Sequence, residues 1–225
     1  MYMKHLAYFS LLILAVSCGT TASMTRISQY PKMYEAKPLT ILVMPPINNT
    51  SNVEAKDLLY TSISKPLAEA GYYVISPHLA MDILKEESAY DSELFVETDL
   101  NKFKEYFGAD AVVFSQIDEW AKKGFGIETK IRYFIKSTSD NEVLFDRSCD
   151  LYLDLSQDSG QTSLLGVLVD IAASAITTAA TDHIVAARKA NAFIFSDMPR
   201  GKYDSMHGLD GKMLAQEKNI TTRVK

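Results

Sequence analysis

Short apolar runs and longer amphipathic stretches alternate along residues 39–203 of this chain. Residues 39–44 form a mostly apolar run bounded by prolines, which is typical of a central strand covered on both faces. Residues 53–70 repeat apolar positions at helical spacing and are followed by Gly71, a residue favoured just after a helix. Because a proline ring disrupts helical hydrogen bonding, Pro66 inside this pattern predicts a bend or a division of the helix.

The middle of the chain begins with a short strand, predicted over residues 72–75. Two helices are expected next, over about 78–86 and 99–107. The segments 109–120, 125–135 and 143–153 then alternate apolar and polar residues and are joined by tight turns, which predicts an antiparallel meander. In the second segment the side chains expected to face the core are Phe125, Ile127, Thr129, Ile131, Tyr133 and Ile135.

The longest predicted helix covers about residues 163–191. Its polar stripe, which includes Asp170 and Arg188, argues against a lipid-facing span, so we expect a helix that covers a sheet. His183 lies on the apolar stripe and is expected to be a hydrogen-bonded core histidine. The resulting fold class is α/β (α+β): one mixed sheet of about five strands in the order β-α-β-α-α-β-β-β-α, with a long C-terminal cover helix.

The first residues form a separate apolar signal. Lys4 precedes an apolar run over 6–16, and small residues 17–19 follow, which is the order of a secretory signal. Cys18, placed after a small residue, makes this stretch resemble a bacterial lipoprotein signal, in which the cysteine carries diacylglycerol and palmitate chains and becomes the mature N-terminus. Ala15 stands where such signals usually have Leu. The alternative is an ordinary signal peptide cleaved nearby; a retained membrane helix is disfavoured because roughly 20 apolar residues are needed to span a bilayer.

These patterns divide the chain into four parts. We expect a signal peptide over 1–17, a flexible tether over 18–38 starting from lipidated Cys18, a single α/β domain over 39–203 and a polar mobile tail over 204–225. Hydrophobic residues make up 47% and charged residues 23%, which are globular values. The net charge of -5 provides no broad basic field, so we expect no nucleic-acid partner.

The candidates for chemistry are few and scattered. A polar loop at 47–52 follows the first strand, where α/β proteins often bind ligands. The favoured interpretation is nevertheless a loop with turn chemistry and a helix N-cap at Ser51 or Asn52. Cys149 shares the inward face of its strand with apolar residues, so a buried thiol is favoured over a nucleophile, although a partner distant in sequence is left open.

An enzyme would have to draw on a small set of side chains without a recognised catalytic spacing. The adjacent carboxylates at 118 and 119 are expected on opposite sides of a strand, which excludes a shared-proton dyad. The exposed residue at 78 has no metal-spaced companion. We therefore expect no catalytic residues, no metal and no cofactor. The set is Asp110, Asp118, Glu119, His78, His183 and Cys149.

Several blocks resemble a family of bacterial lipoproteins of uncharacterised function. The more specific ones are Gly-Tyr-Tyr-Val at 71–74 and Gly-Ala-Asp-Ala at 108–111, within a resemblance that covers about 39–203. The resemblance implies a fold similar to the N-terminal domain of the translocation protein TolB and an association with lipoproteins of the curli-secretion-channel type. It supplies no catalytic residues. The segment after Arg200 is longer and more polar than the usual family ending.

Three functions follow as hypotheses. The first is a non-enzymatic lipoprotein, anchored at the periplasmic face of the outer membrane, that binds protein partners in envelope transport or assembly. The second is a periplasmic binder of a small ligand or glycan that uses the loop at 45–52. The third is an enzyme built from the scattered residues above.

Overall fold

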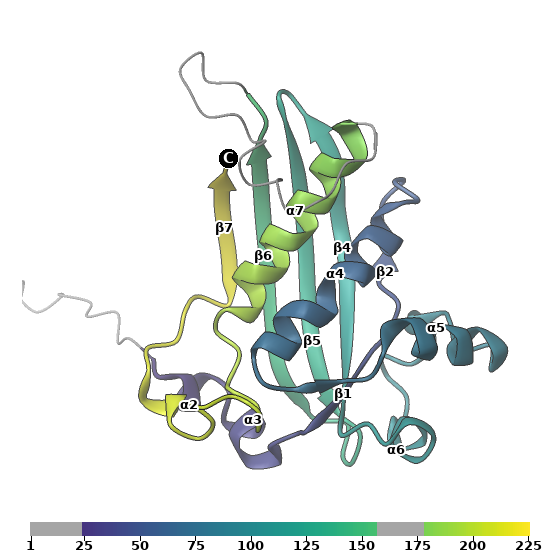
Figure 1. The fold of residues 1–225 in the computed structure, drawn as a ribbon, viewed down its shortest axis with the longest axis vertical. Coiled ribbons are helices and arrows are strands. Elements are labelled where there is room, and N and C mark those ends of the chain that lie inside the picture. Colours follow the sequence, from purple (N-terminus) through teal and green to yellow (C-terminus); the bar gives the residue numbers. More distant parts are fainter. Residues whose placement is uncertain (1–23, 157–177) are drawn as a thin grey trace, which may run out of the picture.

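The computed structural model describes residues 24–156 and 178–225, and within these ranges one mixed sheet of seven strands forms the centre of the molecule (Figure 1). Its order is β3-β1-β4-β5-β6-β7, and β2 pairs with β4 beside β1. The strands are β1 (Thr40–Val43), β2 (Ile47–Asn48), β3 (Tyr73–Val74), β4 (Ala111–Lys123), β5 (Gly126–Ser137), β6 (Val143–Asp154) and β7 (Asn219–Val224).

The predicted mixed sheet and antiparallel meander are confirmed. The β4–β5 and β5–β6 pairs are antiparallel, whereas β1 lies parallel to both β3 and β4. The expected number of about five strands is too low, because β2 and β7 were not predicted. β2 follows Pro45 and Pro46, which donate no backbone hydrogen bond, so pairing with β4 resumes only at Ile47.

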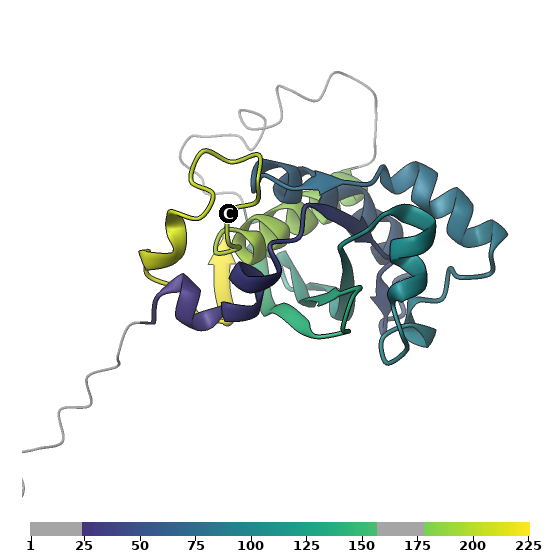
Figure 2. The same cartoon turned by 90° about the horizontal axis from the view of Figure 1, so that it is seen from below.

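Two helices cover one face of the sheet. α4 (Ala55–Glu69) and α7 (Thr178–Phe195) pack against each other and against the strands, and Figure 2 shows both on the same side. Between them and the sheet lies the larger hydrophobic core, which includes Ile63, Ile131 and Ile194. The predicted cover helix is thus confirmed for its described part, which ends at Phe195; residues 163–177 of that prediction lie outside the described residues.

On the other face, the described residues that form a cover lie near β1. α5 (Pro77–Glu86) and α6 (Asn101–Phe107), linked through the 3-10 helix η2 (Ser92–Leu94), pack on a second apolar cluster around Phe114 and Phe134. The rings of these two phenylalanines stack with centroids 5.3 Å apart. Over the far halves of β4 and β5, and over β6 and β7, this face carries polar side chains instead.

The helix α4 runs unbroken through Pro66, so the predicted division does not occur. A proline inside a helix costs about 3 kcal/mol, but Leu59, Ile63 and Leu67 are completely buried along the same helix, and each contributes about 1.5–3 kcal/mol. Packing therefore outweighs the lost backbone bond. Gly71 follows the helix with φ of 90°, the left-handed conformation that the sequence predicts there.

Both ends of the expected domain extend further than predicted. Residues 24–38, expected as tether, contain α2 (Arg26–Gln29) and α3 (Pro31–Ala36), and the expected polar tail contains η4 (Asp210–Lys212) and β7. β7 lies parallel to β6 from Asn219 to Val224. These elements are too short to give a periodic signal, and they are held by contacts with residues far along the chain.

The main contact between distant parts of the chain is made by the buried side chain of Arg26. The Arg26 guanidinium donates from Nε to Asp197 Oδ1 at 3.0 Å and from Nη1 to Asp210 Oδ2 at 3.2 Å. Both carboxylates are completely buried, and the arginine is 4% exposed. Tyr30 donates its hydroxyl to Asp197 at 3.1 Å, and the backbone N–H of Gln216 donates to the same carboxylate at 2.9 Å. The N-terminal helices and the C-terminal segment thus meet on one ion cluster.

One expected core residue lies outside. Phe125, assigned to the core by its place in the alternation, is 81% exposed. It belongs to the turn between β4 and β5, where Gly124 has φ of 59°, and β5 begins only at Gly126. The alternation remains correct from Ile127 onward, since Ile127, Thr129, Ile131, Tyr133 and Ile135 are all completely buried.

Replacing Arg26 with alanine is expected to lower the free energy of unfolding by about 3–5 kcal/mol, because it leaves two buried carboxylates without their cation. Urea denaturation of wild type and variant measures this difference. The matched control is Lys32→Ala on the neighbouring helix, which removes the exposed Lys32–Glu142 pair and should cost less than about 1 kcal/mol. Equal losses in the two variants would contradict a structural role for the buried cluster.

Candidate functional site

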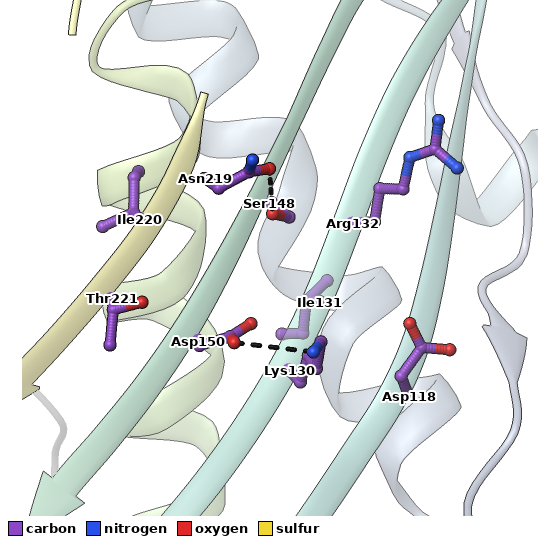
Figure 3. A pocket seen from close by; sticks show the side chains of 9 residues that line it. All are labelled: Asp118, Lys130, Ile131, Arg132, Ser148, Asp150, Asn219, Ile220 and Thr221. Carbon is purple, nitrogen blue, oxygen red and sulfur yellow. Dashed lines mark hydrogen bonds and ion pairs between the residues drawn. The ribbon is translucent and has the colours of Figure 1, made fainter. Parts of the chain in front are cut away.

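The uncovered part of the sheet is the main candidate surface, and we call it the open face. It is formed by outward-pointing side chains of β4, β5, β6 and β7, and in Figure 3 the helices lie behind the strands that carry it. Two adjoining hollows lie on it, with volumes of about 310 and 540 Å³. Its members are Gln116, Asp118, Glu119, Glu128, Lys130, Arg132, Asp146, Ser148, Asp150, Tyr152, Asn219, Thr221 and Arg223.

Opposite charges face each other across the strands of the open face. Arg132 binds Asp146 through two parallel hydrogen bonds of 2.9 and 2.8 Å. Lys130 lies 3.6 Å from Asp150, a pair that is drawn in Figure 3. All four side chains are between 38% and 55% exposed. Such exposed pairs contribute at most about 1 kcal/mol each to folding, so their positions are not explained by stability.

The β7 side of the open face is also polar. Ser148 donates its hydroxyl to the Asn219 side chain at 2.9 Å. The Arg223 guanidinium lies 4.8 Å from the centre of the Tyr152 ring and pairs with Asp154. The sequence alternation identified the water-facing residues of β5 but not these cross-strand partners, because the register between β5, β6 and β7 is needed to bring them together.

A β-bulge corrects the prediction for Asp118 and Glu119. Ile117 pairs with Ile131 and Glu119 with Lys130, so Asp118 is an extra residue on β4. Both carboxylates are exposed, and they line the two adjoining hollows of the same face. The expected opposite orientation is wrong because the bulge shifts the alternation by one residue, and the pattern of polar and apolar residues does not reveal a bulge.

The polar loop over 45–52 reaches the edge of the open face. Asn49 donates its side-chain amide to Asp118 at 2.9 Å, and its backbone N–H donates to the Ile117 carbonyl. Within the loop, Asn48 and Asn52 accept backbone N–H groups two residues ahead. This confirms the reading as turn chemistry, although the expected helix N-cap is wrong: Glu54 occupies the N-cap of α4 without a side-chain bond.

The remaining candidates are dispersed. Asp110 accepts the backbone N–H groups of Leu39 and Thr40 at 3.0 and 3.1 Å, so it fixes the start of β1. His78 is exposed near the start of α5, as predicted. Among the described residues, no group of three or more His, Cys, Asp or Glu side chains is placed to hold a metal ion. Cys18 lies outside the described residues.

Cys149 is completely buried, which confirms the prediction of a core thiol. Burial raises the pKa of this thiol to about 12, and the neighbouring Asp150 acts in the same direction. The nearby charge of Arg147 opposes the shift but is the smallest of the three effects. The thiolate needed for nucleophilic chemistry is therefore scarce at neutral pH.

His183 lies in the core, as predicted, but without the expected hydrogen bond at Nδ1. Its ring stacks on Trp120 with centroids 5.9 Å apart. Burial lowers the pKa of this histidine, and Lys122 lowers it further, while Asp182 and Glu54 oppose the change. The structure thus places the neutral imidazole against an indole and brings no second catalytic candidate to it.

No helix in the described ranges combines the length and apolar character needed to cross a bilayer.

The family model "Putative lipoprotein GNA1162-like" matches residues 28–201. "Putative lipoprotein NMB1124/NMB1162" of Neisseria meningitidis serogroup B (strain ATCC BAA-335 / MC58) is 26% identical over 160 residues, which cover 68% of this chain and 72% of that protein.

Solved structures with similarity to this chain include two from other bacterial proteins. The crystal structure of lipoprotein GNA1162 from Neisseria meningitidis aligns with a TM-score of 0.48 and 24% identity, over 59% of this chain and 94% of that one. The C-terminal domain of LpoB from Escherichia coli aligns with a TM-score of 0.38 and 14% identity, over 55% and 93% of the two chains.

The Cys149 thiol is expected to react with a maleimide at least about a hundredfold more slowly in the folded protein than in urea, because it is buried and protonated. The rate of thiol loss measures this. A matched control is Ser148→Cys in a Cys149→Ser background, since residue 148 points to the open face and should react readily. Comparable rates at both positions would contradict the buried assignment.

Protonation of His183 is expected to destabilise the fold. Its pKa lies below 6.5 in the folded state, so the unfolded chain takes up a proton first as the pH falls. The stability that His183 contributes is present above pH 6.5 and declines as the pH falls below that value. Urea denaturation between pH 7.5 and 5 should show that His183→Leu flattens this dependence, whereas His78→Gln, at an exposed site, leaves it intact. An unchanged slope in His183→Leu would contradict the assignment.

Proposed function

The chain belongs to the GNA1162-like family of lipoproteins, and from this membership we propose that it is a lipid-anchored, non-enzymatic interaction component of the cell envelope. In this proposal Cys18 carries the lipid and holds the folded domain at the periplasmic face of the outer membrane. The domain binds protein partners that act in envelope transport or assembly. The proposal includes lipoproteins of the curli-secretion-channel type as partners. It also includes a domain fold related to the N-terminal domain of TolB.

The observation that carries the proposal is the open face. Here no described helix covers the sheet, and the surface presents paired charges that are still 38–55% exposed. Charges of this kind add little to folding but can exchange their partners with those of another protein, which gives specificity and orientation. The opposite face is closed by α4 and α7, so a partner is expected on the open side.

The scattered chemistry supports a binding role over catalysis. The Cys149 thiol is buried and has a raised pKa, Asp110 is occupied by two backbone N–H groups, and His183 is packed on Trp120. An active site would need such groups to converge on one reacting atom. In the described part of the chain these residues instead serve the core and the start of a strand.

Cys18→Ala is expected to move the protein from the membrane fraction to the soluble periplasmic fraction. The variant lacks the residue that carries the acyl chains in this proposal, and stable anchoring requires more than one such chain. Fractionation and the mass of the mature N-terminus test the anchor. A photo-crosslinking amino acid at Lys130 on the open face should then trap a defined partner in intact cells. The same group at Lys65, on the exposed side of α4, is the matched control.

Retention of Cys18→Ala in membranes, or a mature N-terminus without lipid, would contradict the anchor. A crosslinking pattern at Lys130 no different from that at Lys65 would contradict the role of the open face. Turnover of an envelope substrate that is lost on replacing an open-face carboxylate would contradict the non-enzymatic assignment.

A further inference from the structure

The strand β7 forms one edge of the sheet. It is the last strand in the order β3-β1-β4-β5-β6-β7, and among the described residues its ladder partner is β6. Its sequence, Asn-Ile-Thr-Thr-Arg-Val, contains no proline and four β-branched residues, which favour extended structure. Edge strands usually avoid further pairing through bulges, prolines, short length or charged side chains. β7 runs for six residues without a bulge or a proline, and its one charged side chain, Arg223, pairs with Asp154.

The register identifies the backbone groups that face outward. The Ser148 N–H donates to the Lys218 carbonyl at 2.9 Å. In a parallel ladder every second residue bonds to the same neighbour, so the following even-numbered residues of β7 point toward β6. The N–H and carbonyl groups of Asn219, Thr221 and Arg223 therefore point away from the sheet, where an added strand would bind them.

The side chains of β7 define what such a strand would meet. Asn219, Thr221 and Arg223 line the hollows of the open face, whereas Ile220 and Val224 pack against the core. An added strand in register would continue both surfaces. It would place polar residues beside the open face and apolar, β-branched residues beside Ile220 and Val224.

Charge decides the kind of partner. The charged residues over 218–225 are Lys218, Arg223 and Lys225, all positive, although the whole chain carries a net charge of -5. Lys218 is exposed, and the Arg223 side chain is 69% exposed although it pairs with Asp154. Two copies of the 218–225 segment side by side would bring like charges together, whereas an acidic strand would complement them.

We propose that β7 is a docking edge for an extended acidic segment of a partner protein, in which acidic residues alternate with β-branched ones. The segment adds to the sheet through the outward backbone groups of Asn219, Thr221 and Arg223. This inference deepens the proposed function, because it names the chemistry of the partner that the anchored domain receives. Binding by strand addition takes its affinity from backbone hydrogen bonds and its selectivity from alternate side chains.

The test uses the full lipidated chain in detergent and three synthetic eight-residue peptides. The first alternates Glu and Val, the second replaces Glu with Lys, and the third is the Glu peptide N-methylated at alternate residues. Fluorescence anisotropy should show saturable binding of the first, and at least about tenfold weaker binding of the other two, which lack either the complementary charge or the backbone donors.

The protein variants form a matched pair at one position. Thr221→Pro removes an outward-facing N–H without removing a bond to β6, and should weaken binding of the Glu peptide at least about tenfold. Thr221→Val keeps the N–H and should change binding less than about twofold. Lys218→Glu tests the role of charge and should weaken binding of the Glu peptide severalfold. If Thr221→Pro fails to fold, the N-methylated peptide provides the same comparison in the wild-type chain.

Equal binding of the Glu and Lys peptides, or no loss on N-methylation, would overturn the proposal. So would concentration-dependent dimers that Thr221→Pro abolishes, because the occupant would then be a second copy of this chain. These outcomes are separate from failure of the proposed function, since the anchor and the crosslinks at Lys130 are measured in cells without any peptide.

Discussion

The contact of Arg26 with Asp197 and Asp210 joins both ends of the domain to its centre. Burying a guanidinium and two carboxylates is costly unless each is paired and hydrogen-bonded. Asp197 also accepts hydrogen bonds from Tyr30 and the backbone of Gln216, and Asp210 Oδ2 accepts one from the backbone of Arg200, whereas Asp210 Oδ1 is buried without a partner. Through these contacts Arg26, on α2, is held against Asp197, which follows α7, and against Asp210 in the C-terminal segment.

A second buried cation extends this arrangement to the edge of the sheet. Arg147, on β6, is 1% exposed and donates to the Phe193 carbonyl at 2.9 Å and to the Glu217 carbonyl at 2.8 Å. Burial lowers the pKa of this guanidinium, while Tyr30 and Asp197 oppose the shift. Because the carbonyl of Glu217 and the backbone of Gln216 are fixed, the chain enters β7 alongside β6. The proposed docking edge thus depends on the same buried charges that close the fold.

The two faces of the sheet differ in what covers them. One face lies under α4 and α7 and holds most of the apolar core. On the other, α5 and α6 cover the region near β1, and the bulge at Asp118 adds a second carboxylate to the half that no described helix covers. Charged pairs on that half are weak contributors to folding, so in the proposed function this is the surface whose charges exchange contacts with a partner. A lipid anchor would hold it close to partners in the same membrane.

The sequence by itself determined the elements with enough length to show a period. The meander of β4, β5 and β6, the helices α4 and α5, the burial of Cys149 and the mixed α/β class were all predicted, because each rests on alternation or on helical spacing within one segment. The resemblance to a lipoprotein family also came from local blocks, and the family is confirmed.

Only the tertiary structure decided the rest. β7, α2 and α3 are short and polar, and they are ordered by Arg26 and Arg147, whose partners lie 46 to 184 residues away along the chain. The bulge at Asp118 and the cross-strand pair of Arg132 with Asp146 depend on register between strands, which no single segment encodes. Local patterns determine which side of each helix or strand is buried. Ion pairs and backbone hydrogen bonds between distant residues determine how these elements are placed against one another.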